Sequence, residues 1–120
     1  MNRNFPEELR SLLPLTPAVF YVLFALADGE KHGYAIMQET SALSHGKFRM
    51  GPGTLYTTLQ RLLNFGLIEE VEGDRSVEDS RRRYYRLTGT GKSLLEAELG
   101  RMDSVVRLAR SRKLVPRAAG

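Results

Sequence analysis

One stretch of polar side chains in the middle of the chain has the types and spacing needed to hydrogen-bond a nucleic acid. The segment 51–66 reads GPGTLYTTLQRLLNFG, and its leucines fall on one stripe at helical spacing. Such polar groups bond base edges and phosphate oxygens, whereas carboxylates would be repelled by the phosphates. The face opposite the leucines has donors and acceptors but no acid: Thr54, Thr57, Gln60, Arg61 and Asn64.

Individual groups on this segment suit individual partners. The guanidinium of Arg61 can pair with guanine, and the amide of Gln60 can pair with adenine. At the helix start, the backbone amides of Gly53 and Thr54 can hold a phosphate. The alternative is an ordinary solvated helix face that binds nothing.

The distribution of charge favours contact with an anion. The formal net charge is +4, and no Asp or Glu occurs in the segment 40–68, which contains Lys47, Arg49 and Arg61. Positive charge that is clustered in this way, rather than scattered, is typical of nucleic-acid binding. A second basic cluster follows: Arg81, Arg82, Arg83 and Arg86.

Other chemistries have little support in the sequence. There is no cysteine, and the two histidines, His32 and His45, have only Glu39 between them as a further metal ligand, so we expect no metal site. The segment 89–93, GTGKS, is similar to a phosphate-binding loop, but Arg86 stands where that motif needs a glycine. We therefore expect neither an enzyme nor a cofactor.

The elements that would position these groups can be located from caps and periodicity. At 120 residues we expect one domain. Helices are predicted at 17–27 with Thr16 as N-cap, at 33–44, at 52–66, and from Gly89 onward with Thr88 as N-cap. Strands are predicted at 47–50, 67–72 and 82–87, the last two forming a hairpin with a long tip.

This order of elements predicts a mainly α protein with a small β-hairpin, a winged helix-turn-helix followed by a long C-terminal helix. The third helix of that architecture enters the major groove of DNA. We assign residues 1–14 to an amphipathic arm, 15–88 to the winged helix, 89–112 to a dimerisation helix and 113–120 to a basic tail.

The predicted hairpin tip carries arginines that can reach DNA. We expect Arg75, Arg81 and Arg82 to lie along the backbone or in the minor groove. Arg83 and Arg86 are expected instead to pair with glutamates on the facing strand. The alternative is that all of these arginines only form ion pairs with the facing strand, whose glutamates are Glu69, Glu70 and Glu72.

Apolar residues of the last helix predict a homodimer. They repeat at intervals of 4, 3, 4 and 3, which is a heptad seam that a lone protruding helix would expose. Phe20 and Phe24, on an earlier helix that is apolar almost all round, are expected to meet the partner's seam. The seam consists of Leu95, Leu99, Met102, Val106 and Ala109.

Targeting and membrane signals are absent from the sequence. The longest apolar run, 18–27, is half of a membrane span, and no secretory signal precedes it. We therefore expect a cytoplasmic protein with no membrane partner.

Three segments together resemble the PadR family of transcriptional regulators. They are LTPAVFYVLFALADGEKHGYAIMQE at 15–39, GPGTLYTTLQRLLNFGLIEE at 51–70 and RRRYYRLTGTGKSLLEAEL at 81–99. The most specific matches are His32-Gly33-Tyr34 and the GTLY run at 53–56. Many members have proline after that tyrosine, where this chain has Thr57.

The resemblance implies a homodimeric repressor that binds a pseudo-palindromic double-stranded DNA site. Family members respond to small hydrophobic or phenolic compounds, so the resemblance also implies release by an effector of this kind near Phe20, Tyr21 and Phe24. The alternative for these aromatic residues is that they are ordinary core and dimer packing. The alternative is a winged-helix protein–protein adaptor that never binds DNA, and an acid-free third helix disfavours it. The DNA contacts that the resemblance implies are Tyr34, Thr54, Tyr56, Thr57 and Arg61.

Overall fold

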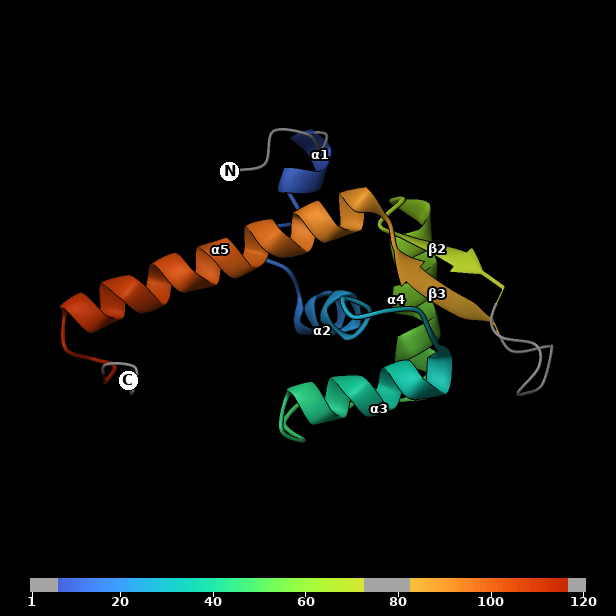
Figure 1. Ribbon diagram of the computed structural model, residues 1–120, viewed down its shortest axis with the longest axis horizontal. Helices are drawn as coiled ribbons and strands as arrows, with labels where there is room; N and C mark the ends of the chain where they lie inside the picture. The colour runs from blue at the N-terminus through green and yellow to red at the C-terminus, as the bar shows by residue number, and fades with distance from the viewer. Residues whose placement is uncertain (1–6, 73–82, 117–120) are drawn as a thin grey trace.

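The computed structural model describes residues 7–72 and 83–116, and these residues form five helices and three strands (Figure 1). The helices are α1 (Glu7–Arg10), α2 (Pro17–Ala25), α3 (Gly33–Leu43), α4 (Pro52–Asn64) and α5 (Gly89–Ser111). The strands are β1 (Lys31–His32), β2 (Ile68–Val71) and β3 (Tyr84–Leu87). The described chain is therefore mainly helical with a small antiparallel sheet, which confirms the predicted fold class.

Helix α2 is the centre of the core. The hydroxyl of Thr16 accepts a hydrogen bond from the Val19 amide at 3.3 Å, and Pro17 occupies the first helical position, as predicted. α2 contacts α3, α4 and α5, so its apolar surface is covered on several sides. Val22 and Leu23 are completely buried. An all-round apolar helix is stable here because it has neighbours on more than one face.

The sheet has the order β1-β3-β2 with both pairings antiparallel. β2 and β3 form the predicted hairpin, with Ile68 opposite Leu87. The predicted strand at 47–50 is wrong, because that segment belongs to a loop. There the Ser44 hydroxyl accepts the Phe48 amide hydrogen at 2.9 Å and donates to the Phe48 carbonyl at 3.1 Å, which folds the chain back on itself. The third strand is instead β1, which pairs with β3.

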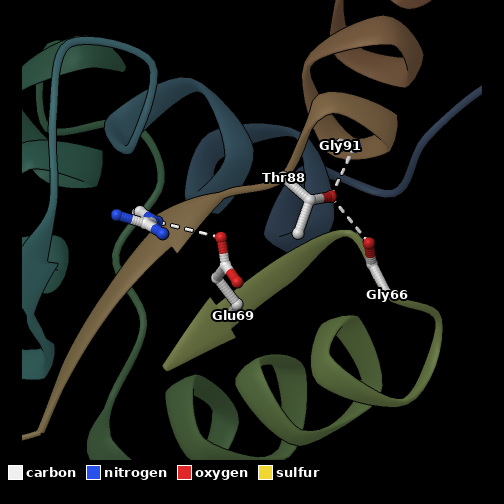
Figure 2. A network of polar contacts seen from close by, with 5 residues as sticks. Gly66, Glu69, Thr88 and Gly91 are labelled. Carbon is white, nitrogen blue, oxygen red and sulfur yellow. Dashed lines mark hydrogen bonds and ion pairs between the residues drawn. The ribbon is translucent and has the colours of Figure 1, made fainter. Parts of the chain in front are cut away.

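A tight junction joins the end of α4 to the start of α5. α4 ends in a Schellman arrangement, in which Gly66 adopts a φ of +70° and the Leu67 amide donates to the Leu62 carbonyl at 2.9 Å. The Thr88 hydroxyl then donates to the Gly66 carbonyl at 2.6 Å and accepts from the Gly91 amide at 3.0 Å (Figure 2). Thr88 is thus the N-cap of α5, as predicted, and it also bonds the glycine that follows α4.

Gly91 allows this junction to close. A Cβ atom at Gly91 would lie 1.9 Å from the carbonyl oxygen of Leu67, a distance that no side chain tolerates. The obstacle is backbone rather than a flexible side chain, and the same carbonyl accepts the Thr88 amide hydrogen at 3.1 Å. Glycine is required here for close approach of the backbones.

The described part of the N-terminal arm, residues 7–14, packs against the same core. Leu9 of α1 is buried with the residues of α2. The Glu98 side chain of α5 is only 1% exposed, and its Oε2 accepts the Leu15 amide hydrogen at 2.7 Å. Its Oε1 accepts from Nε of Arg101 at 2.6 Å, and this hydrogen bond raises the pKa of the Arg101 guanidinium. A buried carboxylate therefore links the residue before the N-cap of α2 to α5.

The apolar seam of α5 divides into a buried part and an exposed part. Leu95 is 4% exposed and Phe20 is 9% exposed, and both belong to the core of the protomer. The expectation that these two residues face a partner is corrected, because their surface is already covered. The remaining residues of the predicted dimer set are at least partly exposed: Phe24, Leu99, Met102, Val106 and Ala109.

We predict opposite effects of alanine at two glycines of α5. Gly91→Ala should lower the free energy of unfolding by about 2 kcal/mol or more, because its methyl group meets the Leu67 carbonyl. Gly100→Ala, in open space on the same helix, should raise it by about 0.5–1 kcal/mol. Urea unfolding followed by circular dichroism at one protein concentration measures both, and similar shifts for the two variants would contradict the junction.

Candidate nucleic-acid interface

Helix α4 has the two faces that its sequence predicts. Its inner face packs into the core through Leu55, Leu59 and Leu62, each at most 1% exposed. Its outer face is exposed and contains no acid, so its donors and acceptors are available to a partner. The exposed residues of the predicted site on this helix are Gly53, Thr54, Tyr56, Thr57, Gln60 and Arg61.

The N-terminus of α4 is open. Gly51 is the N-cap with extended backbone, and no side chain caps the helix. The first intrahelical bond runs from the Leu55 amide to the Gly51 carbonyl, so the Gly53 and Thr54 amides precede the hydrogen-bonded turns. A Cβ atom at Gly51 or Gly53 would meet nothing within 4 Å. The positive end of the helix dipole therefore faces unobstructed space.

The second half of the outer face forms a shallow depression lined by Tyr56, Thr57, Gln60, Arg61 and Asn64. The Gln60 side chain donates from Nε2 to Oδ1 of Asn64 at 3.2 Å. The Arg61 guanidinium lies over the Phe65 ring at 6.0 Å from its centroid. Asn64 was recognised as part of the polar face but was not assigned to the site, and its bond to Gln60 is a signal that only the structure supplies.

Tyr34 of α3 lies beside this face. Its side chain is 61% exposed, and that of Tyr56 is 59% exposed. The two helices meet closely, because a Cβ atom at Gly33 would lie 3.6 Å from the Tyr56 hydroxyl oxygen. The structure therefore brings Tyr34 together with the α4 residues. Lys47 is also exposed, but it follows the opposite end of α3 and does not belong to this group.

The wing strands carry two ion pairs in their described part. Arg86 and Glu69 lie opposite each other in register, with Nε and Oε2 2.9 Å apart. Arg83 lies 4.0 Å from Glu70, and both pairings confirm the prediction for these two arginines. Burial, with the nearby Glu70 carboxylate, raises the pKa of Tyr85 between them. Three further wing arginines lie outside the described residues and stay predictions: Arg75, Arg81 and Arg82.

Two chemistries that the sequence disfavours are a phosphate-binding loop at residues 89–93 and a metal site at the histidines. Residues 89–93 form the first turn of α5, which is an ordinary capped helix start. His32 caps α3, as expected for a histidine at a helix N-terminus. Within residues 7–72 and 83–116, no three His, Cys, Asp or Glu residues are grouped closely enough to hold a metal ion. None of the helices in the same ranges has the length and apolarity needed to cross a membrane.

A second surface is the protruding half of α5. Figure 1 shows this helix extending away from the sheet and beyond the other helices. None of its residues from 103 to 111 is buried, although Val105 and Leu108 are large apolar side chains.

The aromatic side chains of α2 contact one another and a neighbouring loop. The ring centroids of Phe20 and Phe24 are 5.5 Å apart, and Tyr21 stacks on Phe48 with its centroid at 5.5 Å.

Sequence comparison relates the chain to transcriptional regulators. The model of the transcriptional regulator PadR-like family matches residues 22–97. The chain is 39% identical over 87 residues to the transcriptional regulator Rv3488 of Mycobacterium tuberculosis, and the alignment covers 72% of this chain and 77% of that protein. The matched region includes α3, α4 and the hairpin, which carry the candidate interface.

Structure comparison gives the same architecture. A PadR family transcription regulator from Clostridium difficile R20291 is similar with a TM-score of 0.67 at 23% identity, over 80% of this chain and 97% of that one. Bacillus subtilis PadR in complex with operator DNA is similar with a TM-score of 0.60 at 23% identity, over 72% of this chain and 48% of that one. At these identities the likeness concerns the fold, and it confirms the winged helix.

Proposed function

The chain belongs to the PadR-like family of transcriptional regulators, and on that premise we propose that it is a homodimeric, sequence-specific DNA-binding repressor. A regulator of transcription is not an enzyme, as the sequence predicted. We also propose that it works in the cytoplasm, as the sequence predicts for a regulator that must reach DNA.

The observation that carries the proposal is the exposed, acid-free face of α4 with the open helix N-terminus at its end. A phosphate at this N-terminus would receive the Gly53 and Thr54 amides and the favourable end of the dipole. From that anchor, the following turns of α4 would present Thr57 and Gln60 to base edges in the major groove. Arg61 can reach either guanine or a phosphate.

Supporting contacts surround this helix. Tyr34 and Tyr56 are both exposed, so their hydroxyls can bond phosphates that flank the groove. Lys47 and the wing arginines Arg75, Arg81 and Arg82 would bind the backbone farther out. The pairing of Arg83 and Arg86 with glutamates limits the negative charge that the wing shows to DNA.

The proposed dimer forms through the exposed part of α5. Two copies related by a two-fold axis would bury Leu99, Met102 and Val106. Their two α4 helices would then read a pseudo-palindrome with half-sites about one helical turn, or a similar integral spacing, apart. A small hydrophobic or phenolic effector would act near the α2 aromatics, where Tyr21 and Phe48 offer a stacked pair.

We predict that substitutions on α4 reduce operator binding more than general DNA affinity. The operator is first obtained by selecting duplexes from a random pool with the purified protein. Thr57→Ala and Gln60→Ala should each cost about 1–3 kcal/mol on that operator and much less on a scrambled duplex, because they remove base contacts. Titrations of both duplexes at several salt concentrations measure this difference.

Arg86→Gln is the matched control for these titrations. Arg86 is an exposed arginine of the winged helix that is paired with Glu69, so its loss removes no base contact and frees one carboxylate. The affinities for operator and for scrambled DNA should therefore fall by the same small factor. Equal losses on operator and scrambled DNA for the α4 variants would reject base readout by this face. Failure of the wild type to select any duplex would favour the adaptor alternative.

We predict that acids on the exposed seam of α5 separate the dimer. Leu99→Glu with Met102→Glu would place two charges in the proposed interface, and the protein should sediment as a folded monomer or as unfolded chain. Gly100→Glu with Ser104→Glu adds the same charge to exposed positions outside the seam and should leave the dimer intact. Light scattering at micromolar concentration measures the molar mass of the wild type and of both double variants. A wild type with the mass of a monomer would disprove the dimer.

A further inference from the structure

His32 lies where three elements of the candidate interface meet. It is the last residue of β1, and it pairs with Tyr84 of β3 in register. Its Nδ1 accepts the Ala35 amide hydrogen at 3.3 Å, which caps the first turn of α3. Its ring also meets the Tyr84 ring edge-on, with centroids 5.4 Å apart and planes at 87°. One side chain therefore connects the base of the wing to the start of α3.

The chain directly after His32 is held between the wing and α4. A Cβ atom at Gly33 would lie 3.3 Å from Cδ2 of Leu55 and 3.6 Å from the Tyr56 hydroxyl oxygen, so α4 approaches the backbone closely there. Tyr34 follows directly, and its side chain is largely exposed to solvent. The position of the Tyr34 hydroxyl thus depends on how firmly the first turn of α3 is fixed.

We propose that His32 is a positioning residue for DNA binding, and that it acts through Tyr34. Its imidazole fixes the first turn of α3 against β3, so that the Tyr34 hydroxyl is already oriented when it meets a phosphate. This inference rests on the proposed function, because it names a residue that the same DNA-binding surface requires. His32 itself need not touch DNA.

Substitutions can separate the cap that the imidazole forms with Ala35 from its ring contact with Tyr84. Asparagine is a favourable N-cap, so His32→Asn keeps an acceptor for α3 while it loses the aromatic ring. Leucine keeps apolar volume against Tyr84 but has no acceptor, and alanine has neither. If the cap fixes Tyr34, the asparagine variant should bind DNA much better than the leucine and alanine variants.

The test is a double-mutant cycle measured on the selected operator. His32→Ala and His32→Leu should each weaken binding about five- to tenfold, the effect of losing a cap of ordinary strength, while His32→Asn stays within about threefold of the wild type. In a Tyr34→Ala background, His32→Ala should cause little further loss, because the side chain that it positions is absent. Urea unfolding of each variant confirms that the proteins compared are folded.

Thr57→Ala provides the matched control background. Thr57 is exposed on α4, and its proposed contact does not pass through His32, so the losses from His32→Ala and Thr57→Ala should multiply. The leucine variant keeps the cycle measurable if the alanine variant does not fold, because it retains apolar packing against Tyr84.

Three results would overturn the inference. The first is that His32→Ala weakens operator binding by the same factor in the Tyr34→Ala background as in the wild type, which would show that His32 acts independently of Tyr34. The second is operator binding by Tyr34→Ala equal to that of the wild type, since nothing would then need positioning. Both leave the proposed function standing. The third, a wild type that selects no duplex, would overturn the proposed function and this inference together.

Discussion

The contact on which the rest of the structure depends is the close approach of Gly91 to the Leu67 carbonyl. It places the first turn of α5 directly on the residues that end α4, and Thr88 closes the joint through its bonds to Gly66 and Gly91. α4 is the helix proposed to read DNA, and α5 is the helix proposed to bind the partner. Their relative orientation is therefore set by backbone contacts, which have little freedom to adjust, rather than by the hairpin between them.

The buried Glu98 carboxylate makes a second connection to α5, one turn before the helix leaves the core. Removing a carboxylate from water is costly, so a buried carboxylate is retained only where its oxygens are satisfied, and here Leu15 and Arg101 satisfy one oxygen each. The amide of Leu15 immediately precedes the N-cap of α2, Thr16. Glu98 thus holds the start of the central helix against α5.

The sequence predicted the parts of this fold that depend on local signals. Thr16 and Thr88 were identified as caps because each combines a capping side chain with a following helical pattern. The polar face of α4 followed from periodicity. The pairing of Arg86 with a glutamate of the facing strand followed from two strands of opposite charge, and the structure identifies that glutamate as Glu69. Family resemblance added Tyr34, which no periodic pattern marks as part of a site.

The features that were missed depend on contacts between distant segments. β1 has only two residues, too few to show alternation, and it is a strand because β3 lies beside it. From the sequence alone, Glu98 looks like an ordinary solvent-facing acid of an amphipathic helix, but the structure buries it and bonds it to the distant Leu15 amide. Leu95 and Leu99 are equivalent in the heptad pattern, yet only Leu95 falls where α5 still packs on the core. In α5, the heptad pattern located an apolar stripe, but only the packing of the core on α5 determines which residues of that stripe stay exposed.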